Sequence, residues 1–353
     1  MLRWRTTVLL LSAVLALLPV SCRTPGEVLL QGSGATFPAP LYKRWFLEFY
    51  KQHPQVRINY QAIGSGAGVR QFTEGLTHFG ASDAAMSDKE LAQAEQALDC
   101  KVLMLPMTAG KVSLCYNVPG LAATDTLRLS REVLIDILFG RITHWNDSRL
   151  LALNSGVHLP ELRITWVRRS DSSGTTYALT NHLSAISQEW KKGPGTNKSV
   201  IWPTGIGGRG NNGVAALIKQ TPGALGYVEY GFARLSKLPM AALENRRGQF
   251  VLPSAATGRA ALGSTPLPDN FRLFLADPDN DQAYPIVTYT WLLVRDRYAD
   301  PEVARTLREV ICWCLTEGQQ ISDSLGYIPL PEAVVQRIVQ ATQQIRSIPQ
   351  DMP

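Results

Sequence analysis

Strand-like and helix-like stretches alternate along most of this chain, and the alternation constrains the fold more than any other feature. Residues 56–60 have the β-branched pattern of a strand, whereas residues 41–52 are typical of a helix. The helix would place four aromatic side chains at core spacing: Trp45, Phe46, Phe49 and Tyr50. Further strands are predicted at 78–82, 102–105, 112–116 and 285–294, and further helices from 69 onward and at 88–98, 302–317 and 332–345. Strands separated by helices need crossovers, so the pattern predicts an α/β sheet.

Two local signals refine this pattern. Ser87 followed three residues later by Glu90 is a capping box, which places the start of the helix at 88–98. The glycine-rich run at 64–68 is expected to form a loop between the strand at 56–60 and a helix that starts at Val69. In α/β sheets, ligands bind beyond the carboxyl ends of the strands, where loops meet helix N-termini.

Size and composition exclude several classes of protein. With 353 residues the chain exceeds a single ordinary core, so two lobes are expected. The hydrophobic share of 45% is too high for a disordered chain, and no internal apolar run is long enough to span a membrane. The formal charge is +6, but the basic residues are scattered rather than gathered in a stripe. Nucleic-acid binding is therefore not expected.

The N-terminus predicts export. Arg3 and Arg5 precede an apolar stretch at 8–18, and small residues follow before Cys22. This order is typical of a secretory signal peptide, which we expect at 1–21. The apolar stretch is shorter than the roughly 20 residues that a crossing helix needs. The protein is expected in the periplasm or at the outer face of the cytoplasmic membrane.

Cys22 stands where a lipoprotein signal places its acylated cysteine. Such signals usually have an aliphatic residue three positions earlier, where this chain has Pro19, so ordinary cleavage nearby is the alternative. If Cys22 is lipidated, residues 22–26 form a tether, and the lipid holds the protein at the membrane without spanning it.

The other cysteines and the histidines point to no metal site. An exported protein can hold disulfides, and Cys100 with Cys115 is a possible pair. Cys312 and Cys314 lie in an apolar run and are interpreted as buried thiols. The five histidines are isolated and no C-x-x-C spacing occurs, so neither a metal nor another cofactor is expected.

Four loops share small, hydroxyl-bearing residues placed just before a helix. They lie at 32–38, 64–68, 81–83 and 168–175. Glycines let a backbone approach a ligand closely, and the free N–H groups of a helix start attract an anion. Arg169 adds a planar fork that matches an oxyanion. Each loop alone could be an ordinary N-cap, but together they favour a site for a tetrahedral oxyanion.

Asp83 distinguishes between oxyanions. It is a carboxylate among donors, so it would repel fully deprotonated sulfate but could accept the proton of HPO₄²⁻ or H₂PO₄⁻. Mispairing a buried polar group costs about 1–3 kcal/mol, which favours protonated phosphate. Asp171, two residues after Arg169, could brace the guanidinium.

At these residues the chain resembles the periplasmic phosphate-binding proteins (PstS family) of phosphate ABC importers. The motifs are G-S-G-A-T-F-P-A-P at 32–40, I-N-Y-Q-x-I-G-S-G at 58–66, F-G-A-S-D at 79–83 and R-R-S-D-S-S-G-T at 168–175. Segments 202–213 and 222–230 also match, and the similarity extends from Leu30 into the C-terminal region.

The resemblance implies a set of phosphate contacts. They fall on Thr36, Phe37, Ser65, Asp83, Arg169, Ser173, Gly174 and Thr175, with Asp171 supporting the arginine. Ala67 and Ser172 depart from positions where the family often has glycine. Ala67 would be strained if its backbone needed a positive φ.

The resemblance also implies a bilobal, type II periplasmic-binding-protein fold, with two α/β lobes joined by a hinge and a ligand cleft between them. The first lobe would hold 27–108 plus 286–353 and the second 109–285. Phosphate contacts to both lobes would favour a closed state, which membrane subunits of the importer would recognise. The protein is expected to act as a monomer.

Two other functions compete with this one. An exported phosphohydrolase would need a nucleophile with a base or a set of metal ligands, and no catalytic residues are evident. A binding protein for a different oxyanion is the nearer alternative. The run Gly205–Gly210 fits the dinucleotide pattern G-x-G-x-x-G, but Trp202 and Pro203 interrupt the preceding strand, so we interpret it as a turn.

Overall fold

The computed structural model describes residues 26–121 and 125–348. The expected signal peptide and Cys22, with most of the tether, lie outside these residues. The strands are β1 Val28–Gly34, β2 Val56–Ala62, β3 Phe79–Ser82, β4 Val102–Asn117, β5 Arg128–Leu129, β6 Thr165–Arg169, β7 Ile206–Gly208, β8 Ala224–Glu229, β9 Ala242–Glu244, β10 Phe250–Val251, β11 Val287–Arg295, β12 Arg297–Tyr298 and β13 Arg346–Ser347.

The helices are α1 Ala39–Gln52, α2 Ser65–Thr73, α3 Asp88–Leu98, α4 Arg131–Leu138, α5 Ser148–Leu153, α6 Gly174–Ile186, α7 Gln188–Lys192, α8 Gly210–Gln220, α9 Tyr230–Leu235, α10 Ala255–Gly263, α11 Pro301–Leu315, α12 Gln319–Ser322 and α13 Glu332–Thr342, with a 3₁₀ turn η1 at Asp323–Leu325. Within the described ranges, no helix has the length and apolar character that crossing a membrane would require.

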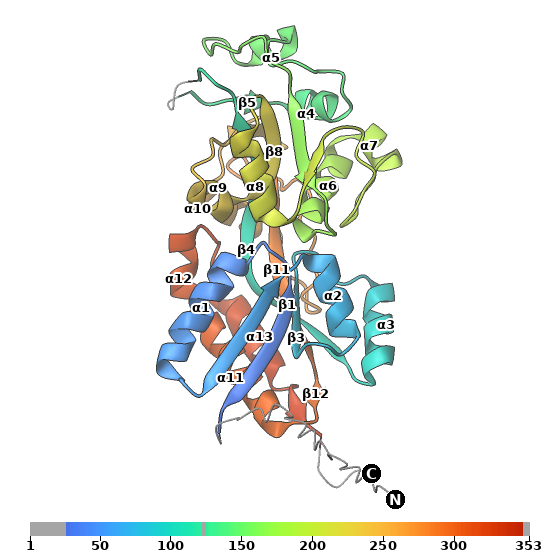
Figure 1. Cartoon of the computed structure of the whole chain (residues 1–353), viewed down its shortest axis with the longest axis vertical. Coiled ribbons are helices and arrows are strands. Elements are labelled where there is room, and N and C mark those ends of the chain that lie inside the picture. Colours follow the sequence, from blue (N-terminus) through green and yellow to red (C-terminus); the bar gives the residue numbers. More distant parts are fainter. Residues whose placement is uncertain (1–25, 122–124, 349–353) are drawn as a thin grey trace, which may run out of the picture.

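One eight-stranded sheet runs through the whole molecule, in the order β2-β1-β3-β11-β4-β8-β6-β7. At one end, β2, β1 and β3 are parallel; at the other, β8, β6 and β7 are parallel. Between them, β11 and β4 are antiparallel to their neighbours. In Figure 1, α1, α2, α3 and α11 to α13 surround the lower part of the sheet, and α4 to α9 surround the upper part. The expected two-lobed α/β fold is confirmed.

The chain passes between the lobes along the two long central strands (Figure 1). β4 pairs with β11 from Val102 to Lys111 and with β8 from Val112 to Asn117. The prediction of two strands here was wrong, because β4 is continuous. Its proline is tolerated at a β-bulge: Pro106 pairs with Trp291 and Thr108 with Thr290, which leaves Met107 as the extra residue.

Other expectations need smaller corrections. α2 starts at Ser65, inside the glycine-rich run rather than at Val69, and Ala67 therefore lies within a helix. In α1, Trp45 and Phe49 are buried as expected, but Tyr50 is exposed. α3 and its capping box of Ser87 and Glu90 are confirmed.

Cys100 and Cys115 do not form a disulfide, and the cysteines of the described ranges are free. The reason is the extended course of β4. Cys115 lies thirteen residues beyond the start of the strand at Val102. At about 3.3 Å per residue this separates it from Cys100 by roughly 40 Å.

Candidate functional site

The eight predicted contact residues come together between the lobes, because they follow strands whose carboxyl ends face the same place. Thr36 and Phe37 follow β1, Ser65 follows β2 and Asp83 follows β3. Arg169 ends β6, Ser173 is the N-cap of α6, and Gly174 and Thr175 are the first residues of that helix. All eight are buried: Thr36, Phe37, Ser65, Asp83, Arg169, Ser173, Gly174 and Thr175.

Phe37 fixes the loop after β1. Its ring packs on Gly110 of β4, where a Cβ atom would lie 2.7 Å from ring carbon Cε1. The Tyr327 hydroxyl donates a 2.7 Å hydrogen bond to the Phe37 carbonyl. The neighbouring Thr36 hydroxyl is thereby held at the junction of the lobes.

Ser65 begins α2 and links three parts of the site. Its Oγ accepts hydrogen bonds from the backbone N–H of Asp83, at 3.3 Å, and of Gly174, at 3.1 Å. Gly174 belongs to the other lobe, and a Cβ atom there would lie 2.6 Å from the Asp83 Cβ. Only glycine allows this approach, so the backbone of one lobe is in direct contact with the backbone of the other at this position.

Asp83 is the acceptor of the group. Its Oδ1 accepts a 3.0 Å hydrogen bond from the Thr290 hydroxyl, and Ser65 Oγ lies 3.5 Å from Oδ2. Burial raises the pKa of Asp83 to about 7, against the opposing effects of the Thr290 hydrogen bond and the Arg169 charge. Near neutral pH this carboxyl can therefore either hold a proton or accept one.

Arg169 is braced by Asp171. Its Nε and Nη2 donate to the two carboxylate oxygens of Asp171 at 2.8 and 2.5 Å, and its Nη1 donates to Thr175 Oγ1 at 3.3 Å. Burial alone would raise the pKa of Asp171, but the hydrogen bonds and charge of Arg169 outweigh it and lower that pKa below its ordinary value. The pair holds the two remaining N–H groups of the guanidinium, one on Nη1 and one on Nη2, in fixed directions.

Three helix N-termini meet at this place. α2 starts at Ser65, α6 at Gly174 and α8 at Gly210, and Ser173 caps α6 by accepting from the Thr176 N–H at 3.1 Å. Helix N-termini present free N–H groups and partial positive charge, which suit an anion.

Ion pairs and backbone bonds also join the lobes around the site. The Gly66 N–H donates to the Ser172 carbonyl at 3.1 Å. Lys198 pairs with Glu90 of α3. The lobes are therefore closed on one another in this structure.

Two further residues, Asn211 and Thr290, belong to the site and are not predicted from the sequence. Asn211, at the start of α8, donates to Thr36 across the junction of the lobes. Thr290 of β11 donates to Asp83. The run Gly205–Gly210 just before Asn211 is predicted as a turn, and Asn211 itself lies in the segment 202–213 that matches the family, but neither signal assigns it a contact. Nothing in the local sequence marks Thr290.

The arrangement suits binding of an oxyanion. It offers hydroxyl, backbone and guanidinium donors, with one carboxylate as the exception. No group of three or more His, Cys, Asp or Glu residues within the described ranges could hold a metal ion.

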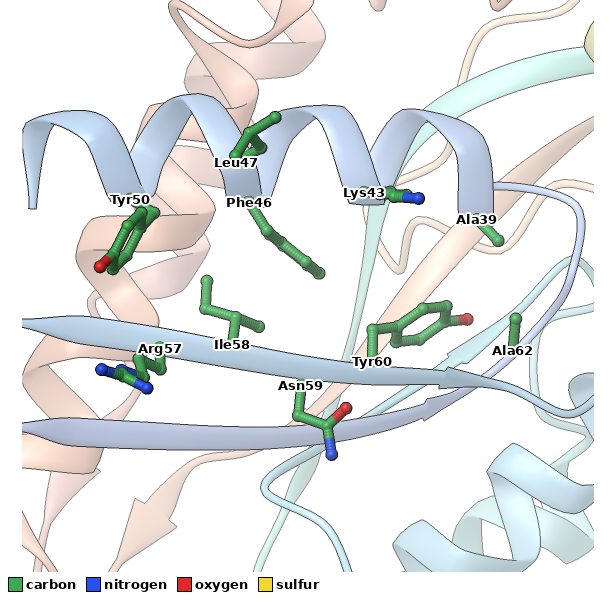
Figure 2. A pocket seen from close by; sticks show the side chains of 10 residues that line it. All are labelled: Ala39, Lys43, Phe46, Leu47, Tyr50, Arg57, Ile58, Asn59, Tyr60 and Ala62. Atoms are coloured by element: carbon green, nitrogen blue, oxygen red, sulfur yellow. The ribbon is translucent and has the colours of Figure 1, made fainter. Parts of the chain in front are cut away.

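A surface groove of about 590 Å³ lies elsewhere on the first lobe, between α1 and β2. Figure 2 shows Phe46 of α1 directed towards Ile58 and Tyr60 of β2. Tyr60 forms part of its floor and donates from its hydroxyl to the Ala35 carbonyl at 2.7 Å. The groove is lined mainly by apolar groups and includes none of the predicted contact residues.

A family model and curated relatives agree on one family, and a solved structure shares the fold. A model of the PBP superfamily domain matches residues 22–317. The phosphate-binding protein PstS of Pasteurella multocida is 39% identical over 311 residues, which cover 88% of each chain. PstS of Methanocaldococcus jannaschii is 38% identical, covering 93% of this chain and 89% of that protein. The structure of a phosphate-binding protein from Stenotrophomonas maltophilia superposes with a TM-score of 0.71 at 20% identity, covering 89% of this chain and 94% of that one.

Proposed function

The chain belongs to the PstS family of phosphate-binding proteins, and from that premise we propose that it binds inorganic phosphate outside the cytoplasmic membrane for an ABC-type importer. The observation that supports the proposal is Asp83, a buried carboxylate that is not paired with Arg169, beside hydroxyl, backbone and guanidinium donors. Above about pH 7, where Asp83 is ionised, a protonated phosphate offers this carboxylate a hydrogen, whereas sulfate leaves the carboxylate facing an anion.

Each predicted contact has a role in this proposal. Thr36, Ser65 and Thr175 donate hydroxyl groups, and Arg169 donates from Nη1. Phe37 donates its backbone N–H from the loop after β1. Ser173 and Gly174 contact the ion from the other lobe, at the start of α6. Asp83 accepts the proton of phosphate, and Asp171 keeps the Arg169 fork in place.

The contacts come from both lobes, so phosphate stabilises the closed arrangement. We place the lobe boundaries at 108/109 and 285/286, within or beside the central strands β4 and β11. Closure would present one surface to the membrane subunits of the importer. The protein acts as a monomeric binding protein and not as an enzyme, and Cys22 is its lipid anchor.

Calorimetric titration above pH 7, where Asp83 is ionised, with phosphate, arsenate, sulfate and molybdate tests this function. We expect tight binding of phosphate, weaker or equal binding of arsenate, and no binding of sulfate or molybdate. Incubation with a phosphomonoester should release no phosphate. Binding of sulfate as tightly as phosphate would favour the other-oxyanion alternative, and catalytic release of phosphate would favour a phosphohydrolase.

A further inference from the structure

Asn211 connects the two lobes at the centre of the site. It is fully buried at the start of α8, in the second lobe. Its backbone N–H and its side-chain Nδ2 both donate to Thr36 Oγ1 of the first lobe, at 3.2 and 2.9 Å. Nδ2 also donates to Thr175 Oγ1 at 3.4 Å. One side chain therefore contacts a hydroxyl group in each lobe.

The orientation of the Asn211 amide is fixed by its other end. Its Oδ1 accepts a 2.9 Å hydrogen bond from the backbone N–H of Glu229. A backbone N–H can only donate, so the oxygen must face Glu229 and the NH₂ group must face the two threonines.

The hydrogen bonds of Asn211 determine the direction of the threonine protons. A hydroxyl has two acceptor sites and one hydrogen to donate. Thr36 Oγ1 accepts from two Asn211 donors, and Thr175 Oγ1 accepts from Asn211 and from Arg169 Nη1 at 3.3 Å. With both acceptor sites filled, each hydroxyl can direct only its hydrogen to a further partner.

We propose that Asn211 is a positioning residue that commits the Thr36 and Thr175 hydroxyls as donors to the bound anion. The inference rests on the proposed phosphate site and extends it. Asn211 does not itself contact the anion. It acts by removing the alternative hydroxyl orientations, in which an oxygen lone pair would face the anion, and by joining the lobes when they are closed.

The test is a mutant cycle measured by calorimetric titration with inorganic phosphate. Asn211→Ala should weaken phosphate binding by about 5- to 100-fold, the range expected when buried hydroxyls lose fixed partners. In a Thr36→Val/Thr175→Val background, which lacks the hydroxyls, the same change should have little further effect. The loss should therefore be strongly non-additive.

Asn154→Ala is the matched control. Asn154 is also buried in the second lobe, but its amide bonds to backbone rather than to hydroxyl groups: Oδ1 accepts from the Arg128 N–H, and Nδ2 donates to the carbonyls of Arg128 and Leu150. This variant should lower the melting temperature without changing phosphate affinity. Asn211→Asp provides a second variant with the same shape, which retains the acceptor for Glu229. It should weaken phosphate binding more than Asn211→Ala does, because a carboxylate would accept the threonine protons and add a repulsive charge.

The outcomes separate the two hypotheses. Wild-type affinity in Asn211→Ala and Asn211→Asp, or a loss that persists in full without the two hydroxyls, would overturn the positioning role while leaving phosphate binding intact. Failure of the wild-type protein itself to bind phosphate would overturn the proposed function, and this inference with it.

Discussion

Replacing Asp83 with asparagine should change both the stability of the ligand-free protein and the choice of anion. Its pKa is raised from the ordinary 3.8 to about 7 by burial. At 1.36 kcal/mol per pKa unit, the ionised form is disfavoured by about 4 kcal/mol relative to an exposed carboxylate. Asp83→Asn removes this term, so above pH 7 the ligand-free variant should be more stable than wild type by up to about 4 kcal/mol.

The pH dependence of this gain follows from its sign. A carboxyl with a raised pKa contributes stability below its ordinary pKa and loses that contribution as the pH rises through the folded value. The gain of Asp83→Asn should therefore be smallest near pH 4 and complete above about pH 7. Urea unfolding of the ligand-free protein at several pH values measures it.

The same substitution should weaken phosphate binding although it stabilises the ligand-free protein. Thr290 donates to Oδ1, so the oxygen of the new amide would face Thr290 and its NH₂ group would take the place of Oδ2. The ligand proton would then meet a donor, and phosphate should bind more weakly by about 1–3 kcal/mol. Sulfate, no longer facing a carboxylate, should bind measurably.

Calorimetric titration with both anions tests the exchange of specificity. Asp136→Asn is the control, because Asp136 is a buried carboxylate paired with Arg141 and Arg149 rather than with the site. Sulfate exclusion that persists in Asp83→Asn, with phosphate affinity unchanged, would refute the acceptor argument.

Three further predictions concern the guanidinium, a buried histidine and the thiols. Arg169→Ala should weaken phosphate and arsenate binding alike, by about 2 kcal/mol or more, since it removes a charged donor and leaves Asp171 without its partner; retention of affinity in titration would contradict the contact. Burial lowers the pKa of His182 to about 3, so its contribution to stability is present above its ordinary pKa of 6.5 and is lost as the pH falls towards 3. His182→Gln should therefore lose less stability than wild type between pH 7 and pH 4 in urea unfolding. A thiol reductant should leave the melting temperature unchanged, because the four cysteines of the described ranges are free; a clear decrease would reveal a disulfide.

Elements with local signals could be predicted from the sequence. Ser87 and Glu90 determine the start of α3 through contacts within four residues, so the prediction matched the structure. The start of α2 depends on distant contacts, including the bond from the Gly66 N–H to Ser172 of the other lobe, and it was missed. The continuity of β4 through Pro106 depends on a bulge opposite β11, which local propensity does not encode.

The residues of the site also fall into those that local sequence predicts and those that it does not. The loops that follow the strands carry recognisable motifs, so their residues could be named from the sequence. Asn211 and Thr290 act through side chains that contact partners 175 and 207 residues away in the chain. Such residues become evident only when the fold brings the partners together.

The joint between the lobes is a continuous piece of sheet with a bulge beside Thr290. A change in the angle between the lobes would bend the strands most readily there, because Met107 has no pairing residue on β11. Bending would move the Thr290 hydroxyl relative to Asp83 and so alter the acid strength of that carboxyl. Bending of the central strands would then both release the ion and change the affinity of Asp83 for its proton.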